Sequence, residues 1–202
     1  MSKNEHKTRS SRTSWVRPLT LVAVGFGVGA IFGGGKLVQV YDWETEWNIA
    51  APLSDVYRVM TTPEDQYKWW PSMQVAHIEP IAGYPDGRII EYHVKQAASV
   101  ARLAPPFKII SATRDVEKER RMRSVVTGDL VGVLETLLYS RPDGGTRIVY
   151  HWYVRVHNPV LNLLGFVFEP MFRASHDHVM QEGEAGLQLY CAALPDSIAK
   201  SL

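Results

Sequence analysis

Several common signatures of catalysis are missing from this sequence. It contains one cysteine, Cys191, so it cannot form an intramolecular disulfide or a cysteine-based zinc cluster. No G-x-S-x-G, H-E-x-x-H or P-loop motif is present, and no dinucleotide glycine fingerprint lies between a predicted strand and helix. The formal net charge is +1, which gives no overall case for nucleic-acid binding. We therefore expect no metal, no cofactor and no nucleic-acid partner.

The length and composition favour one folded domain with an appendage. The chain has 202 residues, and its six tryptophans and nine tyrosines suggest a core or cavity rich in aromatic rings. Residues 1–17 are polar and carry five basic side chains against the single acid Glu5. This composition predicts a disordered basic tail.

An uncharged run follows the tail. No residue from Pro18 to Gly35 is charged, which is close to the minimum length for a membrane span, and Trp15 and Tyr41 flank the run as interfacial aromatic residues do. We predict a transmembrane signal anchor over residues 18–38. The basic flank places the N-terminus in the cytoplasm and the folded domain on the opposite side of the membrane.

Two other interpretations of this run stay open. Leu19 to Gly29 could serve as the apolar core of a cleaved signal peptide, with Val28 and Ala30 as the small residues before the cut. Alternatively, the run could be a buried glycine-rich loop or pair of strands. Its glycines at 25, 29 and 33 have G-x-x-x-G spacing, which would allow oligomerisation through a membrane helix. The abundance of glycine in this run also explains the spacing by itself.

The folded domain is expected at residues 41–195, followed by a tail at 196–202. Alternation predicts a strand over 42–49, with Trp43, Thr45, Trp47 and Ile49 on one face. The prolines at 52 and 63 each open a short helix, with Thr62 as the cap of the second. Further strands are predicted at 73–79, 88–95, 107–116, 120–127 and 131–140. A turn at 142–145 joins the last of these to one more strand.

That final strand and the helix after it are both amphipathic. Ile148, Tyr150, Trp152, Val154 and Val156 share one face of the strand, since side chains alternate across it. The following helical pattern has its apolar stripe at spacings of three and four, made by Phe172, His176, Met180, Gly183, Leu187 and Tyr190. We therefore expect the helix to lie against the sheet, with a kink or restart at Pro170.

The order of elements, together with several short motifs, resembles the START-like, or SRPBCC, superfamily. The motifs are WNIAAP at 47–52, TPE at 62–64, WW at 69–70, TGDL at 127–130, GTRI at 145–148 and GE-x-GL at 183–187. The similarity is to the polyketide cyclase/dehydrase-type branch and covers residues 42–194. It implies an α+β helix-grip fold, a curved antiparallel sheet of about six to seven strands around a long C-terminal helix, here preceded by one transmembrane helix. It also implies an apolar cavity for a lipid, polyketide or other hydrophobic ligand.

The turn at 142–145 assigns side chains to faces of the sheet. If Ser140 pairs with Thr146, Leu134 and Thr136 lie beside Trp152 and Tyr150 on a mostly apolar concave face. Glu135 then pairs with His151 on the opposite face. We interpret that pair as an exposed ion pair and not as acid–base chemistry.

His176 is the polar residue in the apolar stripe of the helix. Residues two apart on a helix point in different directions, so His176 and His178 do not share a metal ion. His176 is either a core histidine bonded to a strand carbonyl or hydroxyl, or a polar group on the cavity floor that orients a ligand or transfers a proton. It is the candidate catalytic residue. The expected ligand-binding residues are Trp70, Tyr92, Leu134, Thr136, Tyr150, Trp152, Phe172, His176, Met180 and Gly183.

The leading hypothesis is a membrane-anchored domain that binds or carries a hydrophobic small molecule, such as a lipid or polyketide-like compound. The alternative is a cyclase/dehydrase-type enzyme, in which His176 and either Tyr92 or Tyr150 transfer protons on a hydrophobic, enolisable substrate. A third hypothesis is an interaction module whose cavity is filled by its own rings.

Overall fold

A computed structural model describes residues 38–95 and 107–194 of the chain. The predicted tail at 1–17 and the C-terminal tail at 196–202 lie outside the described residues, as does the predicted anchor apart from Val38. Within the described part, no helix has both the length and the apolar character needed to cross a membrane.

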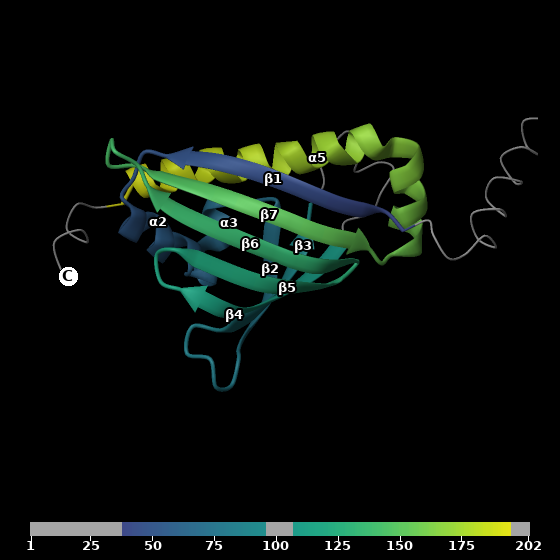
Figure 1. Cartoon of the computed structure of the whole chain (residues 1–202), viewed down its shortest axis with the longest axis horizontal. Helices are drawn as coiled ribbons and strands as arrows, with labels where there is room; N and C mark the ends of the chain where they lie inside the picture. The colour runs from purple at the N-terminus through teal and green to yellow at the C-terminus, as the bar shows by residue number, and fades with distance from the viewer. Residues whose placement is uncertain (1–37, 96–106, 195–202) are drawn as a thin grey trace, which may run out of the picture. The chain divides into compact units, whose positions relative to one another are not determined.

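One antiparallel sheet contains every strand of the described part (Figure 1). Its seven strands have the spatial order β1-β7-β6-β5-β4-β3-β2. The strands are β1 (Val40–Ile49), β2 (Met73–Pro80), β3 (Arg88–Val94), β4 (Phe107–Glu117), β5 (Arg121–Gly128), β6 (Leu130–Ser140) and β7 (Thr146–Val156). The helices are α2 (Leu53–Met60), the 3₁₀ turn η1 (Pro63–Asp65), α3 (Gln66–Trp69) and α5 (Pro159–Ala192).

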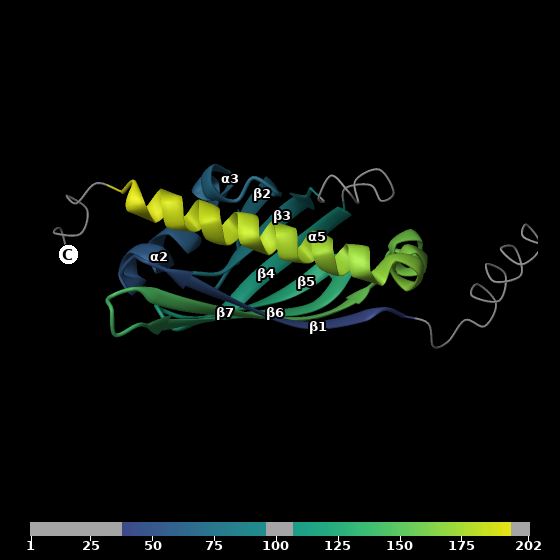
Figure 2. The same ribbon diagram turned by 90° about the horizontal axis from the view of Figure 1, so that it is seen from above.

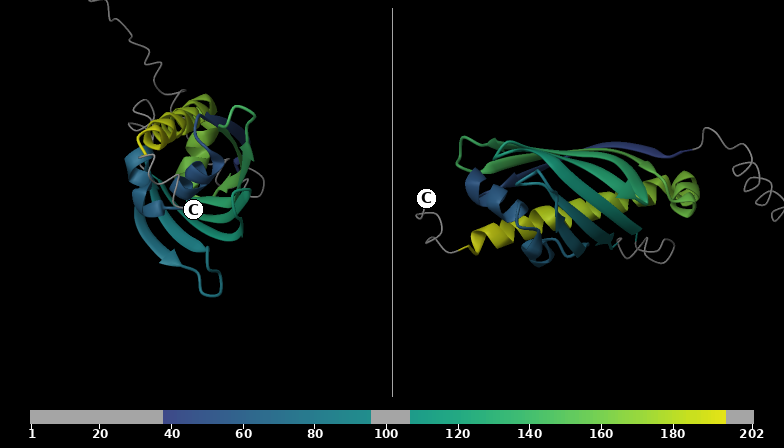
Figure 3. Two further views of the ribbon diagram at one scale, coloured as in Figure 1. Left: turned by 90° about the vertical axis from the view of Figure 1, so that its left-hand side faces the viewer. Right: turned by 90° about the horizontal axis from the view of Figure 1, so that it is seen from below.

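The sheet curves around α5, as Figures 2 and 3 show from above, from below and end-on. Side chains of α5 accept hydrogen bonds from backbone N–H groups at both edges of the sheet. Glu184 accepts from Asn48 on β1 at 2.8 Å, and Glu182 accepts from Ser72, just before β2, at 2.9 Å. The helix therefore closes the opening between the first and last strands of the sheet. This arrangement is the helix-grip fold.

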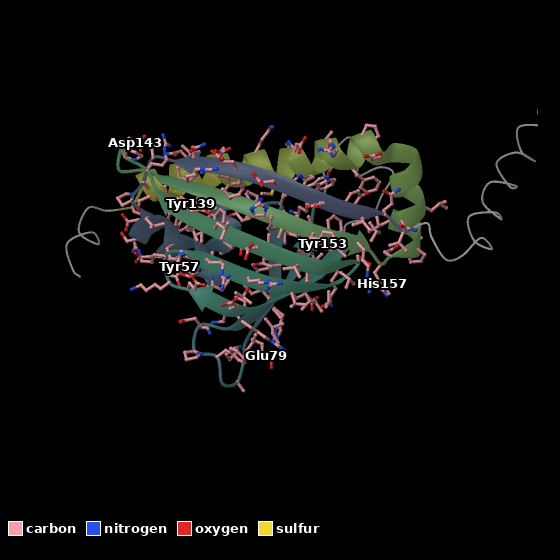
Figure 4. The ribbon with its side chains drawn as sticks, in the orientation of Figure 1. Tyr57, Glu79, Tyr139, Asp143, Tyr153 and His157 are labelled. Atoms are coloured by element: carbon pink, nitrogen blue, oxygen red, sulfur yellow. The ribbon has the colours of Figure 1, made fainter. Side chains whose placement is uncertain are left out.

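The predicted hairpin register is confirmed. Ser140 pairs with Thr146, and Leu134 and Thr136 lie opposite Trp152 and Tyr150. On the outer face, Tyr139 and Tyr153 are exposed to solvent (Figure 4). The pairing of β1 with β7 was not predicted; it sets Trp43 beside Trp152 and Trp47 beside Ile148. Strands distant in sequence thereby bring their aromatic residues to one face.

Three local predictions about the helices need correction. Pro52 precedes α2 instead of opening it, and the Thr62 hydroxyl donates to the carbonyl of Arg58 instead of capping the next helix. The long helix begins at Pro159, earlier than the apolar stripe indicates, because the Asn158 side chain accepts hydrogen bonds from Val160 and Leu161. The helix does not restart at Pro170, which lies inside one continuous helix. The first turns of the helix do run at a steep angle to the rest (Figure 1), as the kink expected from the sequence requires.

A cluster of four aromatic residues fills the core under the second half of α5. The tryptophan cluster consists of Trp47, Trp69, Trp70 and Tyr150. Trp47 contacts Trp70 edge-on at 5.1 Å and Tyr150 at 4.7 Å between ring centroids. These rings occupy the space between sheet and helix at this end of the domain.

Candidate functional site

A partly open cavity of about 100 Å³ lies between the sheet and the part of α5 that precedes the tryptophan cluster. Its wall is almost entirely apolar. Five of the ten predicted ligand-binding residues line it: Trp70, Trp152, Phe172, His176 and Met180. Trp70 belongs to both the cavity wall and the tryptophan cluster, so it marks the closed end of the cavity.

The other five predicted residues do not line this cavity. Thr136 and Tyr150 are buried beside each other on β6 and β7, and Tyr150 contacts Trp47. Leu134 is half-buried and packs against the main core. These residues are on the predicted face of the sheet, but the rings of Trp47 and Trp70 pack against Tyr150 there, which the sequence pattern does not reveal.

Tyr92 and Gly183 also belong to the packed core. The Tyr92 hydroxyl donates a hydrogen bond to the Gln66 side chain at 2.9 Å, and burial raises the pKa of Tyr92. A Cβ atom on Gly183 would lie 2.7 Å from ring atoms of both Trp47 and Trp70. Gly183 therefore permits close contact between helix and rings and leaves no room for a ligand.

The sequence reasoning missed most of the cavity wall. The additional lining residues come from six strands and from α5: Tyr41, Trp43, Met73, Val94, Phe107, Ile109, Leu130, Val154, Val156, Leu161, Ser175 and Val179. The alternation of β1 placed Trp43 on the same face as Trp47 and Ile49, and that was the available signal. The residues that lie next to Trp43 across the sheet are set by the pairing of β1 with β7. That pairing has no local sequence signature, so these neighbours were not predicted.

Trp43 connects β1 to α5 at the cavity. Its ring stacks on Tyr41 with centroids 4.4 Å apart and contacts the His176 ring at 4.3 Å. The guanidinium of Arg173 lies 5.6 Å from the same indole ring. The contact with Trp43 holds the imidazole of His176 against the inner face of β1.

His176 lies in the cavity wall with one ring nitrogen unpaired. Its Nδ1 is 3.3 Å from the Asp177 carboxylate, and its Nε2 is buried without a hydrogen-bond partner among the described residues. Of the two interpretations of His176, the core histidine bonded to a strand carbonyl or hydroxyl is therefore not what the described residues show. Burial lowers the pKa of His176, Asp177 raises it to a smaller extent, and Arg173 lowers it further. Since burial is the largest of these effects, the imidazole is neutral at pH 7.

Trp152, another residue of the cavity wall, carries a second unpaired polar atom. Its Nε1 is buried with no partner in the described part of the chain. The buried polar atoms of Trp47, Trp69 and Tyr150 are also unpaired, but Trp47, Trp69 and Tyr150 do not line the cavity. Across residues 38–95 and 107–194, His176 and Trp152 are the only cavity-lining residues with a buried, unpaired side-chain nitrogen or oxygen, and each of these atoms exposes less than 1 Å².

The predicted Glu135–His151 ion pair has different partners. The two residues are opposite each other, half-buried on the outer face, as the register requires. However, His151 lies 3.3 Å from Glu44, and Glu135 lies 3.9 Å from Arg121. The carboxylate that lies close to His151 is that of Glu44, because β1 pairs with β7 and sets these two residues opposite each other. Among the described residues, no group of three acidic, histidine or cysteine side chains is placed to hold a metal ion.

Comparison with known proteins identifies the fold. No protein-family model and no curated protein matches the chain. Among solved structures, TTHA0849 from Thermus thermophilus has a TM-score of 0.60 at 16% identity, over 76% of this chain and 98% of that one. The Zhui aromatase/cyclase from a Streptomyces species has a TM-score of 0.55 at 15% identity, over 76% and 94%. A conserved protein from Geobacillus kaustophilus has a TM-score of 0.58 at 12% identity, over 76% and 95%.

Similarity at these identities concerns the fold alone. It agrees with the seven-stranded sheet and the long C-terminal helix, and so with the helix-grip architecture expected from the sequence. Any function must be argued from the cavity of this chain.

Proposed function

We propose that this domain binds a hydrophobic small molecule in the cavity between α5 and the sheet. The observation that carries the proposal is a partly open cavity with an almost entirely apolar wall, whose few polar side chains include His176. Apolar walls with a few placed polar groups are typical of small-molecule sites. The affinity of a ligand would come from burial of its apolar surface.

The size of the cavity limits what it encloses. At about 100 Å³ it approaches the volume of roughly 150 Å³ at which an apolar cavity has bound benzene in another protein. The enclosed part of the ligand is therefore of the size of one ring or a short branched chain. A longer ligand would extend through the open side. Burial contributes about 25 cal/mol per Å² of apolar surface, so binding of a ring alone would be weak.

Filling the cavity tests the proposal. Val154 is buried in the wall on the inner face of β7, and a Val154→Phe substitution places a ring in the cavity. The matched control is Val125→Phe, since Val125 is exposed on β5. Toluene titrated into the full chain and followed by calorimetry should bind to the wild type and the control, but not to Val154→Phe. Equal binding by all three folded proteins would place the ligand site elsewhere.

The enzyme alternative now rests on His176 alone. Tyr92 and Tyr150, the other candidate proton-transfer groups, do not line the cavity. A neutral imidazole with an unpaired Nε2 has the chemistry of a general base, and one similar structure is an aromatase/cyclase. If compounds extracted from cells are converted by the wild type but not by His176→Gln, the enzyme hypothesis holds. Retention of the compounds unchanged by both proteins supports a carrier.

We also propose that residues 18–38 anchor the domain to a membrane. The support is the uncharged run between a basic flank and Lys36. The described domain begins at the next residues, with the Gln39 N–H bonded to the Asn162 side chain at 2.7 Å. A ligand could then be taken from the bilayer beside the domain.

A further inference from the structure

Exposed aliphatic side chains gather where β1 and α5 begin. Val38 and Val40 lie at the start of β1, and Val160 and Leu163 lie in the first turns of α5. Each of these four side chains, which we call the aliphatic patch, is 45–56% exposed. Single exposed apolar residues are ordinary on a protein surface, whereas a group of them indicates a surface for contact with a protein or a membrane.

Hydrogen bonds hold the two halves of the aliphatic patch at one end of the domain. The Gln39 N–H donates to the Asn162 side chain at 2.7 Å, and the Gln39 carbonyl accepts from the Val156 N–H at 2.9 Å. The two valines near β1 flank Gln39 in the chain, and the two patch residues of α5 lie within two positions of Asn162. Figures 1 and 2 both show the start of β1 and the first turns of α5 at the same end.

The sequence of α5 at the aliphatic patch is free of charge. No residue from Asn158 to Phe168 is charged, and the charged residues of the helix begin at Glu169. A helical segment without charges requires an apolar environment on more than one side. Leu161 obtains this environment from the domain, since it is buried. Val160 and Leu163 are exposed and do not.

The same two segments form part of the cavity wall. Tyr41, which follows Val40 in β1, lines the cavity. Leu161, which lies between Val160 and Leu163 in α5, also lines it. The aliphatic patch and this part of the wall are therefore carried by the same turns of backbone, and a partner on the patch would lie close to the cavity.

The chain that precedes Val38 favours a lipid surface as that partner. The uncharged run of residues 18–35 ends three residues before Val38, and three residues span at most about 11 Å even when fully extended. If the run crosses a bilayer, as proposed above, the patch is held at the membrane surface. Docking by four aliphatic side chains would be weak by itself, but the anchor converts it into an intramolecular event at a high effective concentration.

We propose that the aliphatic patch docks on the lipid bilayer and inserts its four side chains among the lipid headgroups. The wall residues Tyr41 and Leu161 then lie next to the membrane, which gives a hydrophobic ligand a short path between the bilayer and the cavity. This inference rests on the membrane anchor of the proposed function, and it adds the orientation of the domain on the membrane.

Quenchers attached to lipids test the docking on the full chain. Leu163→Cys and Leu189→Cys each carry one environment-sensitive fluorophore, and Leu189 is the matched control because it is an exposed leucine near the opposite end of the same helix. The wild type, treated in the same way, gives the background from the buried Cys191. In phosphatidylcholine vesicles, nitroxide-labelled lipid should remove most of the fluorescence at position 163 and leave that at position 189 unchanged.

A charge in the aliphatic patch tests the same contact while the anchor stays in place. Val160→Asp should reduce the quenching at position 163, because a carboxylate enters the lipid interface unfavourably. The fold should be retained, since an acidic residue is favourable in the first turn of a helix. The matched control is Val125→Asp, at an exposed valine of β5, which should leave the quenching unchanged. Circular dichroism verifies that each variant is folded.

The outcomes separate the docking from the anchor. If the full chain does not float with the vesicles, the anchor fails and the docking fails with it. If the chain floats but the label at position 163 is not quenched, or is quenched no more than the label at 189, the docking proposal is wrong while the anchor stands. Unchanged quenching in Val160→Asp also overturns the insertion of the patch.

A water-soluble quencher distinguishes other occupants of the aliphatic patch. Iodide should reach the label at position 189 and not the label at 163. If position 163 is protected from iodide but not quenched by the nitroxide lipid, a protein surface covers the patch, either a second copy or residues 18–35 of the same chain. That result overturns the docking on lipid.

Discussion

The indole nitrogen of Trp70 donates a hydrogen bond of 2.9 Å to the backbone carbonyl of Val179. This bond joins the end of α3 to the middle of α5. The Trp70 ring also stacks on Trp69 at 5.4 Å and contacts Trp47 at 5.1 Å. Trp70 therefore fixes the position of the long helix over the sheet and forms the boundary between the filled core and the cavity.

Loss of this bond should lower stability. Trp70→Phe removes the N–H and part of the ring volume from a buried site, and we expect the free energy of unfolding to fall by about 2–4 kcal/mol. Urea unfolding of the full chain measures the change. The comparison is Trp43→Phe, at a half-buried ring outside the main core, which should cost less. Equal costs for the two substitutions would contradict the role assigned to Trp70.

Two glycines of α5 should not tolerate a methyl group. A Cβ on Gly186 would clash with the backbone carbonyl of Trp69, and one on Gly183 would press on the rings of Trp47 and Trp70. Alanine usually stabilises a helix relative to glycine by about 1 kcal/mol. Here we expect Gly183→Ala and Gly186→Ala to destabilise by about 1–3 kcal/mol or more, with the larger effect at Gly186, because a backbone carbonyl moves less easily than a ring.

Thermal unfolding midpoints of the two glycine variants test this expectation. Gln181→Ala, at an exposed position of the same helix, should leave the midpoint nearly unchanged. A rise in the midpoint for both glycine variants would show that helix propensity outweighs the close contact.

The neutral form of His176 predicts a dependence of stability on pH. Its pKa is lower in the folded protein than the ordinary value of about 6.5, so the unfolded chain binds the proton more readily. The contribution of neutral His176 to the free energy of unfolding is therefore complete above about pH 6.5. The free energy of unfolding falls as the pH decreases from there towards the pKa of His176 in the folded protein. Chemical unfolding between about pH 5 and 7.5 should show this slope.

The slope must disappear when the group is removed. His176→Gln should lack it, whereas His178→Gln, at an exposed neighbouring position, should retain it. An unchanged slope in His176→Gln would assign the pH dependence to other groups.

The single thiol should be unreactive in the folded state. Burial raises the pKa of Cys191 to about 11, and the nearby carboxylate of Asp55 adds to the effect. Because the thiolate is the reactive form, a disulfide reagent at about pH 8 should label native protein far more slowly than protein in concentrated urea. Comparable rates in the two conditions would show that the C-terminal turn of α5 opens readily.

Removal of residues 1–37 should release the domain from membranes. The shortened chain keeps Val38, Gln39 and the whole of β1, so its ladder with β7 is intact. We expect full-length protein in the membrane fraction and the shortened protein in the soluble fraction after cell lysis. Membrane association of the shortened chain would contradict the anchor and direct attention to the surface of the domain.

Local sequence features predicted most of the elements. Alternation indicated the faces of β1 and β7, and the turn at 142–145 indicated the register of β6 against β7 without a slip. These features are encoded within about fifteen residues, where periodicity and turn chemistry decide the outcome. The same local evidence placed His176 on the inner stripe of α5, and the structure has it there.

The extent of the cavity depended on contacts between distant parts of the chain. Tyr150, Thr136 and Gly183 have the correct faces, yet Trp47, Trp69 and Trp70 fill the space that a ligand would need beside them. Conversely, Trp43 enters the wall only because β1 pairs with β7. Face and period are properties of one strand or helix, and the sequence by itself determined them. Which rings fill the core and which leave a cavity depends on how large side chains from separate elements share one volume, and only the tertiary structure decided that.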